Sequence, residues 1–248
     1  MKYIINADDF GRTDTVTQAI LYGFENGYLD RTTVMVNQPY FEQATVLAQK
    51  YGFRDRVGLH INLTQGEPLT EQMKACARFC GADGAFNGLI FQNRKMFFLL
   101  TKKEKKAIAA EIDAQIDKYF EYGYSLLHAD SHGHVHTFLS TLPIVIKALK
   151  KRQFQSLRLS ANLTDGFGKR LIKQLMNGRI HRFNRKYRND CRYFDCLSKV
   201  KRAFPAINKE DGVCEVMLHP NIWDGEYKIG ERFDYEDLQF ILDTREGA

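Results

Sequence analysis

Four segments of this chain carry aspartate and histidine residues of the kind that bind metal ions and transfer protons. They are residues 7–11 (ADDFG), residues 58–60 (GLH), residues 128–136 (HADSHGHVH) and the MLHP segment that contains His219. A single buried histidine or aspartate is most often a hydrogen-bonded core residue. Four polar clusters in one chain are poorly explained in that way, so we predict that they form one metal site.

The longest cluster alternates with the two-residue period of a strand. His128, Asp130 and His132 should therefore face one way and Ala129 the other. Same-face neighbours lie roughly 6.6 Å apart, which is too far for all three to bind one ion without a bend. We expect one histidine to bind the metal. Asp130 is then a suitable acceptor for the other ring nitrogen of a ligating histidine.

The paired aspartates Asp8 and Asp9 should point to opposite sides of a regular strand. One carboxylate can then bind the ion while the other accepts a proton from the attacking water. This division of roles is the chemistry of metal-assisted hydrolysis. Release of an amine also needs a general acid, and His219 is the natural candidate.

The elements that carry these clusters read as alternating strands and helices. Strands are predicted at 3–7, 32–37, 57–64, 125–132, 156–160 and 211–220, and helices at 14–27, 39–52, 102–123, 141–153 and 167–176. The strand at 211–220 is expected to close the regular part of the chain. Because functional side chains of parallel α/β folds collect at the carboxyl ends of strands, this pattern brings the clusters together. We predict a single (β/α)-barrel domain spanning residues 1–248.

Two regions lie outside this pattern. Residues 65–98 form a glycine-punctuated stretch, too long for a simple connector and placed where a substrate loop would lie. The net charge is +6, and basic residues concentrate between Lys147 and Arg202. No recognition motif accompanies this charge, so we favour a solvated surface and expect no nucleic-acid partner.

The cysteines, the first residues and the apolar runs of the sequence indicate a cellular compartment. Five cysteines without C-x-x-C spacing favour free thiols over a disulfide framework. The first residues lack the pattern of a signal peptide, and no apolar run reaches the roughly 18 residues that cross a membrane. We therefore expect a cytoplasmic protein without a membrane partner.

The segments ADDFG, GLHINLT, HADSHGHVH and EVMLHP, in this order, resemble the signatures of the YdjC-like carbohydrate deacetylases. The resemblance implies a deformed, TIM-barrel-like (β/α) barrel, one divalent ion (Mg²⁺ or Zn²⁺) and removal of N-acetyl groups from acetylated amino sugars. It also implies a homodimer, since similar proteins are often dimers.

Position by position, the resemblance assigns roles to individual residues. It implies Asp9, His60 and His132 as metal ligands, Asp8 as the catalytic base and His219 as the acid. Asp130, His134 and His136 are expected to support a ligand or to contact the substrate.

Two other functions fit the same residues. Histidine and aspartate clusters also build two-metal phosphoesterase sites, for which the basic region would suit a phosphorylated substrate. A non-catalytic member of the fold could instead bind a sugar without hydrolysing it. One bound ion per chain would favour the deacetylase, and two would favour the phosphoesterase.

Overall fold

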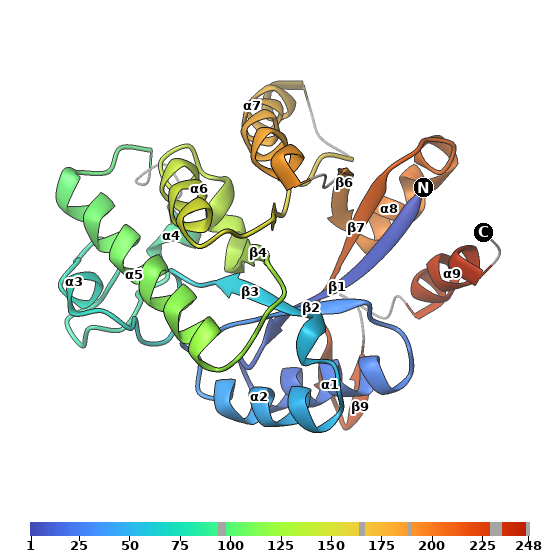
Figure 1. The fold of residues 1–248 in the computed structure, drawn as a ribbon, viewed down its shortest axis with the longest axis horizontal. Coiled ribbons are helices and arrows are strands. Elements are labelled where there is room, and N and C mark those ends of the chain that lie inside the picture. Colours follow the sequence, from blue (N-terminus) through green and yellow to red (C-terminus); the bar gives the residue numbers. More distant parts are fainter. Residues whose placement is uncertain (94–97, 164–166, 188–189, 229–234, 247–248) are drawn as a thin grey trace.

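A parallel sheet of seven strands runs through the centre of the computed structural model, which describes residues 1–93, 98–163, 167–187, 190–228 and 235–246 (Figure 1). The strands are β1 (Lys2–Phe10), β2 (Arg31–Val34), β3 (Val57–Ile61), β4 (His128–Ser131), β5 (Ser156–Leu157), β6 (Cys191–Cys196) and β7 (Val213–Leu218). Their order is β5-β4-β3-β2-β1-β7-β6, and every neighbouring pair is parallel. The first strand, β1, lies inside the sheet between β2 and β7, and the sheet is curled like part of a barrel.

The opening of this barrel lies between β5 and β6. The chain that follows β5 narrows it, because the backbone N–H of Asn162 donates to the carbonyl oxygen of Phe194 in β6, with an N–O distance of 3.1 Å. The side-chain oxygen of Asn162 accepts from the N–H of Phe194 at 3.0 Å. The predicted fold, a deformed (β/α) barrel, is therefore confirmed.

Helices surround the sheet on its outer side (Figure 1). The longer ones are α1 (Asp14–Glu25), α2 (Phe41–Lys50), α5 (Lys102–Glu121), α6 (Leu142–Lys151), α7 (Phe167–Asn184), α8 (Leu197–Ile207) and α9 (Tyr235–Glu246). The short ones are α3 (Glu71–Lys74), α4 (Leu89–Gln92) and the 3₁₀ turns η1 (Arg54–Arg56), η3 (His132–Thr137) and η4 (Arg185–Tyr187). α5 begins with a capping box between Thr101 and Glu104, and Ile108, Ile112 and Ile116 form its buried face.

The core fills the space between these helices and the sheet. All five residues of β3 are buried, as expected of a strand covered on both faces. Apolar side chains of β1 and β7, such as Ile5, Ala7 and Val216, are fully buried as well. Polar side chains inside the barrel are therefore surrounded by apolar packing and must find partners within the protein.

Several boundaries differ from the sequence prediction. β4 ends at Ser131, so His132 lies in the turn η3 and not in the strand. The basic region contains β6 and the beginning of α8, which the sequence pattern did not indicate. The strand at 211–220 does not close the regular part, since the hairpin β8 (Asn221–Trp223) and β9 (Glu226–Lys228) and helix α9 follow it.

The region at 65–98 also has more structure than predicted. It contains α3 and α4 and an isolated bridge between Cys80 and Phe86. Residues 94–97 of this region, and 164–166 and 188–189 of the basic region, lie outside the described residues. All five cysteines are free thiols, as predicted.

Candidate active site

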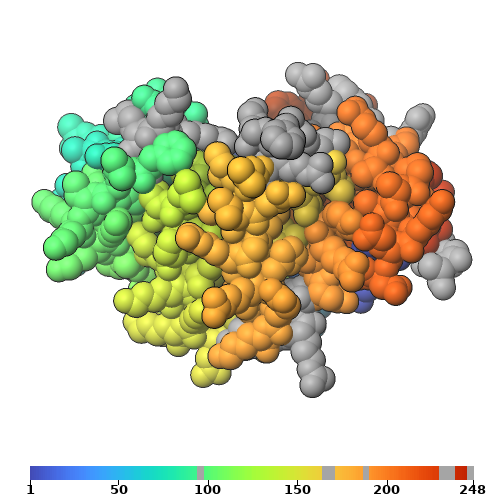
Figure 2. Space-filling model, turned by 90° about the horizontal axis from the view of Figure 1, so that it is seen from above, coloured from blue at the N-terminus to red at the C-terminus, as the bar shows by residue number. Residues whose placement is uncertain are grey.

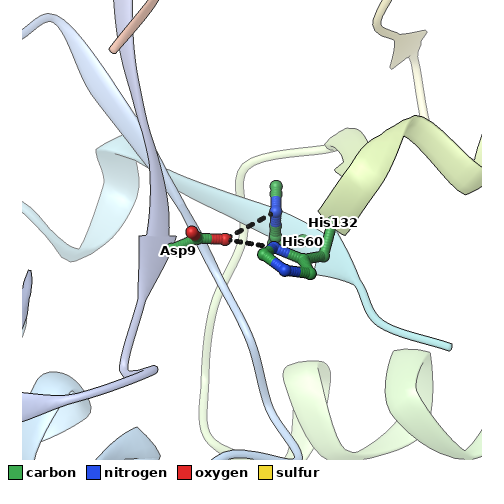
Figure 3. A group of neighbouring side chains, drawn as sticks. All are labelled: Asp9, His60 and His132. Carbon is green, nitrogen blue, oxygen red and sulfur yellow. Dashed lines mark hydrogen bonds and ion pairs between the residues drawn. The ribbon is translucent and has the colours of Figure 1, made fainter. Parts of the chain in front are cut away.

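Asp9, His60 and His132 come together from three separate elements, β1, β3 and η3 (Figure 3). Oδ1 of Asp9 lies 2.6 Å from Nδ1 of His132 and 3.1 Å from Nε2 of His60. One ligand atom from each residue lies within 4.8 Å of the others. Of the polar positions in the long histidine segment, only His132 joins this cluster.

The backbone conformation of Asp9 explains how the adjacent residues Asp8 and Asp9 contact different partners. Asp9 has a φ of +70°, and the pairing of β1 with β2 shifts register between Ala7 and Phe10. A left-handed aspartate is uncommon and marks a site where the backbone is held in place by its surroundings. The regular strand assumed from the sequence is therefore wrong at Asp9, although Asp8 and Asp9 do face different partners.

The second nitrogen of His60 is held by Asp130. Nδ1 of His60 lies 2.6 Å from Oδ1 of Asp130, and Thr33 donates its hydroxyl to Oδ2 of the same carboxylate at 3.0 Å. In the neutral ring, which is the form that binds a metal, a carboxylate at Nδ1 keeps the proton there and leaves the lone pair on Nε2. The position of Asp130 therefore fits its expected role of supporting a ligating histidine.

The polar atoms of this cluster fit a divalent cation. Nε2 of His60 is buried without a hydrogen-bond partner in the described part of the chain, although a carboxylate oxygen of Asp9 lies beside it. Burial lowers the pKa of His60, but Asp130 first and then Asp9 and Asp8 outweigh it and raise the pKa to about 10. The site thus favours a positive charge between His60 and Asp9, and imidazole and carboxylate are suitable ligands for zinc and other divalent ions.

Asp8 is anchored by a two-pronged ion pair. Nη1 and Nη2 of Arg158 donate to the two oxygens of Asp8 at 2.6 and 2.7 Å, and Asn6 donates to Oδ1 at 2.9 Å. Burial raises the pKa of Asp8, but the charge and hydrogen bonds of Arg158 outweigh it, and the pKa falls below its usual range. Nε2 of His219 lies 3.9 Å from Oδ2 of Asp8, so the expected base and acid face each other.

Arg158 joins the carboxylates of the barrel interior. Besides Asp8, it contacts Asp130 at 2.8 Å and Glu215 at 2.6 Å, and its guanidinium lies over the ring of Phe194. Glu215 in turn pairs with Arg31 at 2.7 Å. Sequence reasoning missed Arg158 and Glu215. The available signal was an arginine between two leucines in the predicted strand 156–160, since a charged residue at such a position needs a buried partner.

The other histidines of the long segment lie away from Asp9. His136 is fully buried, with Nδ1 2.6 Å from the hydroxyl of Ser131 and Nε2 3.1 Å from the carbonyl oxygen of Arg158. The ring of His134 lies against Phe194. Nδ1 of His128 lies 2.7 Å from the hydroxyl of Ser156. His136 therefore supports the backbone that carries Arg158, and its burial argues against direct contact with substrate.

The open side of the site is marked by partly exposed polar side chains. Nη1 of Arg12 lies 3.0 Å from Oδ2 of Asp9 with its side chain 39% exposed, and the side chain of His219 is 34% exposed. Asp8 and Asp9 themselves are almost fully buried. Arg12 and His219 are therefore the groups through which solvent comes nearest to the two carboxylates.

The chain is similar to known carbohydrate deacetylases. A carbohydrate deacetylase of Halalkalibacterium halodurans is 30% identical over 223 residues, which are 89% of this chain and 85% of that protein. One from Vibrio cholerae serotype O1 is 34% identical over 151 residues, covering 61% of this chain but only 56% of that protein.

A crystal structure from Enterococcus faecalis V583, of a protein named for cellobiose-phosphate cleavage, has a similar fold. It matches with a TM-score of 0.67 and 24% identity, covering 90% of this chain and 82% of that one. At this identity the likeness supports the fold alone. A family model described as YdjC-like protein matches residues 2–246, which confirms the resemblance drawn from the motifs. The chain therefore belongs to the YdjC-like family.

Proposed function

We propose that this protein is a carbohydrate deacetylase that removes N-acetyl groups from acetylated amino sugars with one divalent ion. The observation that carries the proposal is the cluster of Asp9, His60 and His132 beside an Asp8 that Arg158 holds in place. The family and the names of its relatives support the same activity. Two imidazoles and one carboxylate suit zinc better than magnesium, which prefers oxygen ligands, and we keep both as candidates.

Asp9, His60 and His132 would hold the ion, and Asp130 would fix the ring of His60 through Nδ1. A divalent ion bound there supplies Lewis acidity to the amide carbonyl and lowers the pKa of water. A low pKa is required of that water, because Asp8 is itself a weak base when paired with Arg158.

Asp8 is the residue that accepts the proton of the attacking water. Arg158 orients its carboxylate by donating to both oxygens, and Oδ2 also faces Nε2 of His219. His219 then donates a proton to the departing amine, which cannot leave as an anion. The base and the acid thus lie beside each other, near Asp130 and Glu215, which are already paired with arginines.

Acetate release tests this function. Metal-loaded protein is incubated with N-acetylglucosamine and its short oligomers, and acetate is measured with and without a chelator. We expect release to disappear with chelator and to fall at least about a hundredfold in Asp8→Asn, because proton transfer by a positioned group contributes about 10²–10⁴ in rate.

Asp55→Asn is the matched control, since Asp55 is an exposed aspartate on η1. It removes the same charge and should leave the rate unchanged. Full activity of metal-loaded Asp8→Asn, or no acetate from the whole panel with wild-type protein, would overturn the proposal.

The phosphoesterase alternative needs two ions, and Arg158 weighs against a second one. Asp8 and Asp130, with His60, form another group whose ligand atoms lie within 4.8 Å of one another. Arg158 donates to both of these carboxylates, so a second cation would meet a guanidinium already in place. We therefore propose one ion per chain, and a metal count of two would favour the phosphoesterase.

Location and assembly belong to the proposal as well. Among the described residues, no helix combines the length and the apolar character needed to cross a bilayer. A cytoplasmic location, the absence of a nucleic-acid partner, a homodimer and a single domain over residues 1–248 all stay predictions.

A further inference from the structure

One partly exposed aromatic side chain, that of Phe91, lies next to the proposed metal ligand His132. Phe91 belongs to α4 and is 41% exposed. Its ring lies edge to face with the ring of His132, with 5.7 Å between centroids and 86° between planes. It comes from the region at 65–98, which the sequence predicted as a substrate loop and which the proposed mechanism does not use.

The position of Phe91 is fixed by the backbone between His132 and His134. Gly133 has a φ of +60°, and a Cβ added there would lie 1.9 Å from Cε1 of Phe91. The ring therefore occupies the space that any other side chain at position 133 would fill. A shift of the Phe91 ring would therefore change its contact with Gly133, in the same turn as His132.

The turn that holds Phe91 is anchored on its inner side. Ile90 is buried in the core, and the backbone N–H of Leu89 donates to the side chain of Asn87 at 3.0 Å. The N–H of Phe91 itself donates to the carbonyl oxygen of Gly88, also at 3.0 Å. The exposed ring is thus held in place by a neighbour in the core and is available to a ligand.

We propose that Phe91 is a specificity-determining residue on which the apolar C–H face of the sugar ring stacks while the acetamide reaches the metal site. This inference rests on the proposed function and adds the sugar contact to it. A pyranose ring has one apolar face and a polar rim. The phenyl ring of Phe91 beside His132 suits the apolar face, and partly exposed Arg12 and His219, which contact Asp9 and Asp8, can meet the polar rim. Acetamides without a ring would lose this contact.

The test compares Phe91→Leu, Phe91→Tyr and Phe91→Trp in the full chain loaded with metal. Leucine keeps apolar contact with Gly133 and His132 but removes the aromatic face. We expect Phe91→Leu to raise both the Kd and the KM for N,N′-diacetylchitobiose about three- to tenfold, with kcat within about twofold, and tyrosine and tryptophan to restore them. The control is Phe98→Leu, because Phe98 is 52% exposed in the same region and should leave KM unchanged.

Metal affinity, measured by titration calorimetry, separates stacking from packing. Phe91→Leu should leave the metal Kd unchanged, and a parallel loss of metal and sugar affinity would assign Phe91 to packing against His132 and overturn the proposal. An unchanged sugar Kd would also overturn it. If wild-type protein binds the sugar without releasing acetate, the proposed function fails, whereas the sugar Kd of Phe91→Leu still decides this inference. If wild-type protein binds no sugar, both fail.

Discussion

Replacement of Arg158 by methionine tests the charge balance of the barrel interior. The guanidinium is fully buried and contacts the carboxylates of Asp8, Asp130 and Glu215 at 2.6–2.8 Å. Methionine fills much of the same volume but leaves these carboxylates without their common cation. Breaking a buried ion pair by removal of one partner costs about 3–5 kcal/mol, because the remaining charge is buried and unpaired.

The expected change in melting temperature follows from the size of the chain. A domain of this size loses about 2–4 °C for each kcal/mol, so Arg158→Met should melt about 6–20 °C below the wild type. The loss is a large part of the roughly 5–15 kcal/mol that usually separates folded from unfolded states. Thermal unfolding followed by circular dichroism, with metal removed from all samples, measures it.

Arg152→Met is the matched control. Arg152 pairs with Asp117 at the surface, where the median ion pair contributes about 0–1 kcal/mol, so its melting temperature should fall by less than about 4 °C. If both variants melt within the same few degrees of wild type, the carboxylates do not depend on Arg158, and the account of how Asp8 is held in place is wrong.

Two further predictions concern the histidines. Asp130→Asn should weaken metal binding about 10- to 100-fold, because it removes the carboxylate at Nδ1 of His60; calorimetric titration measures the effect, and unchanged affinity would contradict it. His128 and His136 are fully buried, and burial first, then nearby positive groups such as Arg158, lowers the pKa of each well below 6.5. Only the unfolded chain takes up these protons, so the contribution of these two histidines to stability should be complete above pH 6.5 and fall by up to about 1.4 kcal/mol per pH unit for each histidine below it. His60, whose pKa is raised, is protonated in the folded chain throughout this lower range and adds no slope there. Urea titrations of metal-free protein between pH 7 and 5 measure this slope, and a flat profile would count against neutral buried imidazoles.

The parts of the site that sequence could predict are those governed by strand ends. Asp9, His60 and His132 follow apolar stretches, and parallel strands bring their carboxyl ends to one edge whatever loops intervene. The strand period also predicted that His128 and Asp130 share a face, and both lie in one group with Glu215. The bend at Asp9 could not be read from the sequence, because its left-handed φ results from the packing around it.

The buried ion pairs inside the barrel were harder to predict from the sequence. Arg158 directly follows the two-residue strand β5 at the barrel opening, and its partners come from strands far apart in the sequence. Which carboxylates one buried guanidinium meets depends on how the sheet curls, and no local pattern encodes that. The sequence also did not predict β6, because CRYFDC lacks a clean alternation of apolar and polar residues and lies within a basic stretch.

The position of the bound ion tests the central claim most directly. We expect an anomalous difference map of crystals loaded with zinc or manganese to show one ion per chain, in contact with Asp9, His60 and His132. An ion within the group of His128, Asp130 and Glu215, or no ion at Asp9, would contradict the proposed metal site.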